Sequence, residues 1–228
     1  MFATPRSVDR RYRYAYKPLL FLACLVPLAG CLGGILALSG INGLPAFDLG
    51  SDPVRFVLDT LAKTALNLLF LTLLVTPLRQ LSGNAHLLRL RRMLGLFAFS
   101  YALLHFLCYL GPYRAFDWDE IGKDIAKRPY MTAGFTALLL LIPLAATSTQ
   151  RMMRRLGPRW RSLHRLIYPI AALATLHYWK MLKHEYRRPL LYAVVLALLL
   201  AFRLWQSARR RASAATSRSA PPRAPETA

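Results

Sequence analysis

The chain is poor in acidic residues and cysteines, and it lacks the motifs of a soluble catalytic domain. Its 228 residues include only 10 Asp and Glu, against 31 Lys and Arg, and only three cysteines. None of the cysteines belongs to a C-x-x-C-H motif, which excludes covalent c-type haem attachment, and none has the spacing of a zinc-binding pair. No G-x-G-x-x-G or P-loop motif occurs, so no nucleotide-binding domain is visible.

Long apolar runs dominate the sequence instead. It is 55% hydrophobic, and several runs approach the roughly 20 residues that cross a bilayer as a helix. The runs span about 18–39, 56–78, 93–112, 130–149, 163–180 and 189–207. Since the connections are short, we predict an all-α membrane protein, a six-transmembrane-helix bundle. The expected organisation is a basic cytoplasmic N-terminus at 1–17, a membrane domain at 18–207 and a disordered basic cytoplasmic tail at 208–228.

The net charge of +21 is unevenly distributed, which argues against nucleic-acid binding. Most basic residues fall in four stretches that six spans would place on one side: Arg6–Lys17, Arg79–Arg92, Arg151–Arg165 and the segment from Arg203. By the positive-inside rule this side is cytoplasmic, with both termini in (N-in/C-in). On the opposite side, the stretch Asp117–Asp124 is acidic. It either docks a partner or is a solvated amphipathic turn.

Three histidines in the apolar runs are the candidates for chemistry. His164 and His177 are thirteen residues apart, roughly 20 Å along a helix axis, so they cannot share one ligand. The third and fifth runs cross in the same direction, which brings His105 and His177 to the same depth. An imidazole inside a membrane helix is costly unless it is paired. Two imidazoles at one depth on facing helices suit a six-coordinate haem iron, whereas the plainer alternative is a histidine hydrogen-bonded to a neighbouring helix.

Two further positions have alternative interpretations. His164 lies level with Arg91 and Arg92 near the cytoplasmic side, with no histidine of the third run opposite. It could ligate a second haem with another type of partner, contact a propionate, or belong to a flavin or quinone site. Lys63 follows Asp59 with i,i+4 spacing. The two form a mutual ion pair, or Lys63 meets the carboxylate of a bound cofactor.

Three stretches resemble a known family. They are RRMLGLFAFSYALLHFLCYL, RPYMTAGFTALLLLIPLAATSTQ and LGPRWRSLHRLIYPIAALATLHYWK. They look like the haem-binding membrane subunit of the bacterial periplasmic methionine-sulfoxide reductase system (MsrQ or YedZ type), one of the ferric-reductase-like transmembrane domains. The resemblance covers about residues 18–207. It implies haem b and flavin mononucleotide (FMN) as cofactors, and it carries the family's haem-linked histidines onto His105, His164 and His177.

The resemblance also implies a route for electrons. They would be drawn from the quinone pool or a cytoplasmic flavin reductase, and cross the bacterial inner membrane to a periplasmic molybdopterin-dependent methionine-sulfoxide reductase that repairs oxidised envelope proteins. Relative to the related NADPH oxidases, a fourth histidine is missing near Arg91 and Arg92, and the flavin and NADPH domains are absent. We therefore expect an electron-transfer subunit that needs an external donor. A ferric or cupric reductase and a non-redox membrane scaffold are the alternatives.

Overall fold

The computed structural model describes residues 16–41, 43–83, 87–182 and 185–219, and all regular elements in these ranges are helices. Five are long and apolar enough to cross a membrane, so the chain has the features of a multi-pass membrane protein. They are α2 (Lys17–Leu38), α3 (Pro53–Ser82), α4 (Leu87–Cys108) with its continuation η2 (Tyr109–Tyr113), α6 (Pro129–Ala146) and α10 (Arg187–Ser219).

The predicted fifth span is shorter than expected. Its helix, α9 (Ile167–Met181), has 15 residues, or about 23 Å at 1.5 Å per residue, against a hydrocarbon core of about 30 Å. The 3-10 turn η3 (His164–Leu166) precedes it. The break has a physical cause, because Pro169 tolerates only the first turn of an α-helix and its ring would clash with the carbonyl of residue 165 in a longer one. A bundle of six full spans and its N-in/C-in orientation stay predictions.

Two helices extend into the stretch that the sequence assigned to a cytoplasmic loop. The α3 helix starts at the Asp52 cap, whose side chain accepts a hydrogen bond from the backbone N–H of Arg55 at 3.0 Å. It ends at Gly83, whose φ of 66° is the left-handed conformation that favours glycine. The α4 helix then begins at Leu87, earlier than the predicted 93.

Part of the tail that we predicted to be disordered from residue 208 is helical in the structure. The α10 helix continues to Ser219, because the Ala, Arg and Ser residues beyond 208 include no glycine or proline until Pro221. Residues 220–228 lie outside the described part of the chain.

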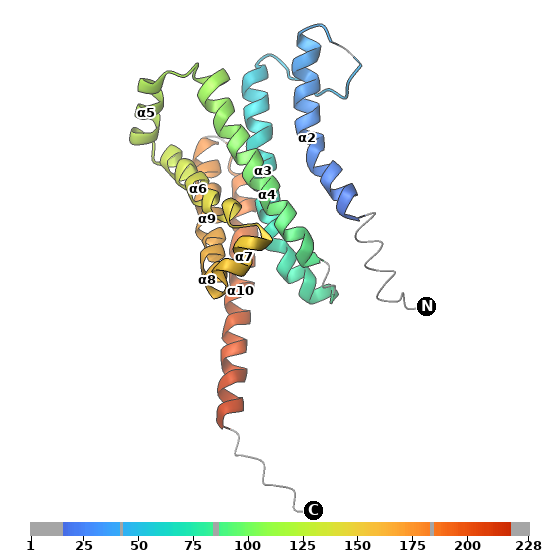
Figure 1. Cartoon of the computed structure of the whole chain (residues 1–228). Coiled ribbons are helices and arrows are strands. Elements are labelled where there is room, and N and C mark those ends of the chain that lie inside the picture. The colour runs from blue at the N-terminus through green and yellow to red at the C-terminus, as the bar shows by residue number, and fades with distance from the viewer. Residues whose placement is uncertain (1–15, 42, 84–86, 183–184, 220–228) are drawn as a thin grey trace, which may run out of the picture.

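The bundle is built on two close helix pairs, α3 with α4 and α6 with α9. Figure 1 shows the connection between α2 and α3, together with the short helix α5 (Trp118–Lys127), at the upper end of the view. The start of α2 and the end of α10 lie toward the lower end. Two short helices, α7 (Gln150–Leu156) and α8 (Pro158–Leu163), connect α6 to α9.

Tyr101 holds α2 against α4. Its hydroxyl donates to the carbonyl of Cys24 at 2.6 Å and accepts from the backbone N–H of Leu28 at 3.2 Å. The hydroxyl therefore inserts into the helical turn of α2 that contains Pro27. In this way Tyr101 of α4 stabilises the turn around the proline. The Tyr101 side chain is only 2% exposed.

Candidate functional site

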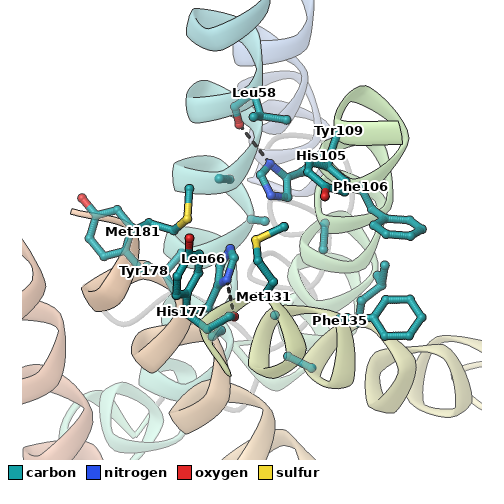
Figure 2. A pocket seen from close by; sticks show the side chains of 18 of the residues that line it. Leu58, Leu66, His105, Phe106, Tyr109, Met131, Phe135, His177, Tyr178 and Met181 are labelled. Carbon is teal, nitrogen blue, oxygen red and sulfur yellow. Dashed lines mark hydrogen bonds between the residues drawn. The ribbon is translucent and has the colours of Figure 1, made fainter. Parts of the chain in front are cut away.

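A cavity of about 300 Å³ lies between α3, α4, α6 and α9, below α5. Most of its wall is apolar, with Leu66, Phe106, Phe135 and Met131 among the side chains that Figure 2 draws. Its polar groups include the two histidines, a cluster of charged side chains that α5 helps to form, and a charged group on α3. An apolar chamber with a few convergent polar groups is the usual form of a cofactor site.

His105 of α4 and His177 of α9 face each other across this cavity. Their ring centres are 6.4 Å apart and their ring planes are inclined by 72°. Figure 2 shows one nitrogen of each ring bonded to a backbone carbonyl and the other turned toward the facing ring. The structure thus brings together the two histidines that the sequence placed at the same depth. Their role as ligands stays a prediction.

The backbone partners fix the tautomer of both rings. His105 Nδ1 lies 3.1 Å from the carbonyl oxygen of Leu58 on α3, and His177 Nδ1 lies 2.7 Å from that of Tyr130 on α6. A carbonyl oxygen only accepts, so each Nδ1 carries a proton and donates it. Each Nε2 is then an unprotonated donor of electrons toward the cavity, which is the form that binds a metal. A hydrogen bond to a neighbouring helix and ligation of a metal, the two alternatives for these histidines, can therefore hold for the same ring.

Gly134 makes room for the His177 ring. It lies four residues after Tyr130, so the ring passes over it to reach the Tyr130 carbonyl. A Cβ atom at this position would lie 2.7 Å from His177 Nδ1 and 2.9 Å from Cε1. No side chain fits there without displacing the ring, and the absence of a side chain at residue 134 is part of the histidine site.

The spacing of the two rings matches one shared metal ion. Imidazole binds first-row metals at about 2 Å from nitrogen, and the ring centre lies about 1.1 Å further, so two rings on opposite sides of one ion have centres about 6.2 Å apart. No group of three or more His, Cys, Asp or Glu side chains that could hold a metal occurs in the described part of the chain. Two protein ligands suit a metal whose remaining ligands come from a bound macrocycle.

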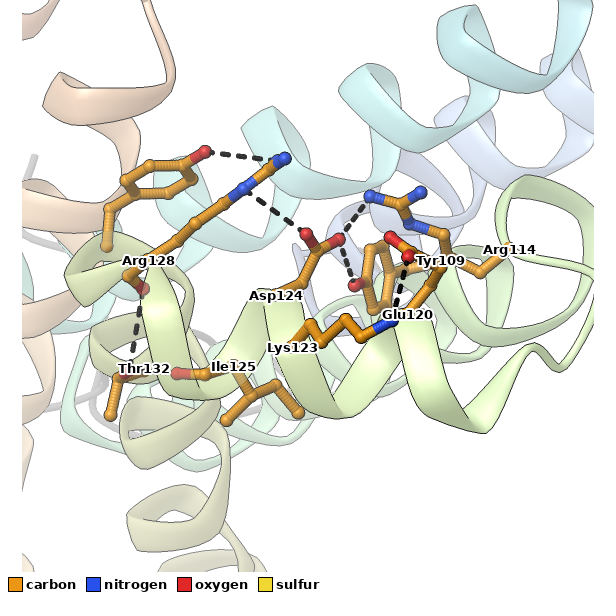
Figure 3. A network of polar contacts seen from close by, with 9 residues as sticks. Tyr109, Arg114, Glu120, Lys123, Asp124, Ile125, Arg128 and Thr132 are labelled. Atoms are coloured by element: carbon orange, nitrogen blue, oxygen red, sulfur yellow. Dashed lines mark hydrogen bonds and ion pairs between the residues drawn. The ribbon is translucent and has the colours of Figure 1, made fainter.

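A buried carboxylate dominates the end of the cavity near α5. The side chain of Asp124 is 4% exposed and forms ion pairs with Arg114 and with Arg128, the latter at 3.2 Å from Nε. The Tyr109 hydroxyl donates to it at 2.9 Å. Figure 3 shows the three partners around the carboxylate. The η2 π-helix, which contains Pro112, widens the last turn of α4 and brings Tyr109 and Arg114 to the same side.

The other acidic residues of this region are largely paired within α5. Lys123 Nζ lies 2.6 Å from Asp119 and 3.5 Å from Glu120, and the Asp119 carboxylate raises the pKa of Lys123. Asp117 caps the helix by accepting the backbone N–H of Glu120 at 3.1 Å. The predicted acidic docking surface therefore presents fewer unpaired carboxylates than its sequence indicates. Its role in docking stays a prediction.

Lys63 lies at the cavity wall, and its ion pair with Asp59 is loose. The Nζ–Oδ2 distance is 3.9 Å, and the two side chains are 40% and 54% exposed. Both residues, with Arg55, line the cavity. The structure thus contains the predicted i,i+4 pair and also leaves Lys63 within reach of the cavity.

His164 lies elsewhere, at the opposite end of the bundle. Its ring stacks on Trp160 with 4.0 Å between ring centres, and Nδ1 lies 3.2 Å from the Trp160 carbonyl oxygen. The positive charge of Arg91 acts on the His164 ring, so these two side chains lie near each other. Neither His164 nor Arg91 lines the cavity, and Arg92 is an exposed residue outside it. The three predicted site residues on this side therefore lie outside the cavity.

Sequence reasoning missed the positions that shape the site without ionisable side chains. The Leu58 and Tyr130 carbonyls and Gly134 contribute backbone atoms or empty space, which no residue pattern marks. It also did not single out Arg114 and Arg128. The signal that could have found them is their spacing around Asp124, at ten residues before and four after.

Comparison with known proteins agrees with this architecture. Residues 60–175 match the family described as ferric reductase like transmembrane component, so the chain is a ferric-reductase-like transmembrane protein. It is 52% identical over 212 residues to the protein-methionine-sulfoxide reductase heme-binding subunit MsrQ of Xanthomonas campestris pv. campestris strain 8004, covering 92% of this chain and 95% of the relative. The protein of the same name from Herminiimonas arsenicoxydans is 46% identical, over 86% and 87% of the two chains. The chain belongs to the MsrQ family, as the sequence motifs predicted.

Proposed function

We propose that this protein is the haem-binding, electron-transferring membrane subunit of a methionine-sulfoxide reductase system. The observation that carries the proposal is the His105–His177 pair, with ring centres 6.4 Å apart and both Nδ1 atoms committed to carbonyls. The relatives are named heme-binding subunits of protein-methionine-sulfoxide reductase, which supports both the cofactor and the partner.

The residues present fit a haem b. The two ring centres are 6.4 Å apart, close to the spacing of two imidazoles that share one metal ion, and the surrounding wall is largely apolar, as a porphyrin requires. The Nε of Arg114, one of the cavity-lining residues, is buried and has no hydrogen-bond partner, which is expected where a ligand carboxylate belongs. When bound, the haem supplies reversible one-electron chemistry at iron.

The protein's contribution is to fix and insulate that group. His105 and His177 would hold the haem iron from the protein side, and ligation by both would leave no open position for oxygen or peroxide, which favours electron transfer over oxygen chemistry. Carbonyl bonds from Leu58 and Tyr130 keep the imidazoles oriented and electron-rich. The apolar wall excludes water, and Gly134 allows α6 to approach the His177 ring.

We further propose that electrons pass from the cytoplasmic to the periplasmic side of the bacterial inner membrane. The positive-inside rule supports this orientation, because the arginine-rich connections gather at the end where His164 lies. There Arg91 and the exposed Arg92 provide positive charge for an anionic donor, such as the phosphate of FMN or a quinone site. On the other side, α5 would meet a periplasmic molybdopterin-dependent reductase subunit.

Ligand replacement tests the proposed haem site. His105→Gly and His177→Gly each open one axial position, so we expect the purified variants to be high-spin or haem-depleted, and added imidazole to restore the low-spin absorption spectrum. His164→Ala is the matched control, because its ring lies outside the cavity, and it should stay low-spin. Retention of a fully low-spin haem by both glycine variants without imidazole would contradict the assignment.

A further inference from the structure

The cluster around Asp124 carries more positive charge than it needs. One buried carboxylate is paired with two guanidinium groups, those of Arg114 and Arg128, so the cluster has a net charge of +1. The α3 wall, where Lys63 pairs with Asp59 and Arg55 also lines the cavity, has the same net charge of +1. The Asp124 cluster differs in burial, because Asp124 and Arg114 are only 4% and 24% exposed, whereas Lys63 and Asp59 are 40% and 54% exposed. A poorly solvated cation beside an apolar cavity is stabilised by a bound anion.

Arg114 also has a donor that lacks an acceptor. One terminal nitrogen binds Asp124, and the guanidinium lies over the Tyr109 ring at 6.0 Å and the Tyr113 ring at 5.5 Å from their centres. These contacts hold the group in a fixed orientation. Its Nε–H is buried and without a partner in the described structure. Buried donors are almost always hydrogen-bonded in folded proteins, so this one indicates a missing acceptor.

Arg114, Arg128 and Asp124 line the same cavity as His105 and His177. We propose that Arg114 and Arg128, oriented by Asp124, form a carboxylate-binding site for a propionate of the haem that the two histidines hold. The inference rests on the proposed function and adds the residues that fix the edge of the macrocycle. Asp124 is then a positioning residue, which holds both guanidinium groups so that their remaining N–H groups meet the ligand.

The chemistry of the cofactor accounts for the choice. The two propionates are the only charged groups on haem b, and an apolar cavity favours their placement at its charged edge. Guanidinium groups bind carboxylates through two parallel N–H bonds, which fixes orientation as well as charge. Arg114, which is more buried than Lys63 and has a buried N–H without an acceptor, therefore fits a propionate better than the exposed pair of Lys63 and Asp59 does.

A modified haem tests the proposal. The parent protein and the Arg114→Gln and Arg128→Gln variants, stripped of haem in detergent, are reconstituted with protohaem or with its dimethyl ester, which lacks both carboxylates. The rate of haem transfer to excess apomyoglobin is then measured. We expect protohaem to leave each variant at least tenfold faster than it leaves the parent, whereas the ester should leave all three at similar rates. Lys63→Gln is the control for loss of a different cavity cation, and it should retain protohaem longer than either arginine variant.

Each other outcome has a definite meaning. Equal acceleration of both haems in an arginine variant would show a structural role only and would overturn the proposal. Unchanged release of both haems would overturn it as well, and a loss of turnover with the periplasmic reductase in that case would assign the arginines to docking. Failure of the parent to bind either haem would instead contradict the proposed function itself.

Discussion

Adding one methyl group at Gly134 should disturb the histidine pair directly. The new Cβ atom would lie 2.7 Å from His177 Nδ1, whereas ordinary contacts begin near 3.4 Å. The ring or the α6 backbone must therefore move by roughly 0.7 Å, more than three times the roughly 0.2 Å tolerance of a metal–ligand distance. The same movement stretches the 2.7 Å bond to the Tyr130 carbonyl.

The expected loss of affinity follows from two opposing contributions. Overpacking a tight contact costs about 1–3 kcal/mol, and replacing glycine by alanine within a helix recovers about 0.5–1 kcal/mol. The net cost of about 0–2.5 kcal/mol corresponds to a haem affinity that is up to about 70-fold weaker. We expect Gly134→Ala to show a mixed high-spin and low-spin absorption spectrum and faster haem loss than the parent protein.

A second glycine provides the control. Gly95 lies within α4, and a Cβ atom added there would have only one neighbour, the Thr72 methyl group at 3.9 Å. Gly95→Ala should therefore keep the parent spectrum and the parent rate of haem loss. If Gly134→Ala remains fully low-spin with unchanged haem loss, the close approach of α6 to His177 has no part in ligation, and the reasoning fails.

Three further changes have expected outcomes. His164→Ala should leave the low-spin spectrum intact and slow haem reduction by the cytoplasmic-side donor in stopped-flow experiments, and reduction at the parent rate would remove its proposed role. Neutralising Asp117, Asp119 and Glu120 together changes the net charge of the exposed face of α5 from −1 to +2, counting its two lysines. Turnover with the periplasmic reductase should therefore fall at low ionic strength and recover with added salt. Turnover equal to that of the parent at low salt would show that this face only contacts solvent. Tyr101→Phe leaves buried backbone groups of α2 unsatisfied and should lower thermal stability by about 1–3 kcal/mol without changing the haem spectrum, and an unchanged unfolding temperature would contradict this.

The sequence predicted the helices better than their ends. Apolar runs locate five spans, because a segment in lipid must form its backbone hydrogen bonds internally and therefore folds as a helix. The ends depend on local chemistry that hydropathy averages away. Pro169 delays the start of α9, the glycine cap at Gly83 lets α3 run past its apolar run, and the unbroken Ala/Arg/Ser segment lets α10 continue to Ser219.

The histidine pair was accessible to sequence reasoning because depth in a membrane can be counted along parallel helices. Its supporting contacts were not accessible, because Tyr130 and His177 are 47 residues apart and meet only through the packing of α6 on α9. The Asp124 cluster was misjudged for a related reason. In the sequence it is one acid among several, and only folding separates this buried carboxylate from the exposed ones.

The most direct test of a single haem held by two histidines is whether the reduced protein binds carbon monoxide. With both axial positions occupied by His105 and His177, purified protein reduced with dithionite should show a low-spin spectrum that carbon monoxide does not change. A spectrum that shifts fully on addition of carbon monoxide, or a purified protein without any Soret band, would contradict the account.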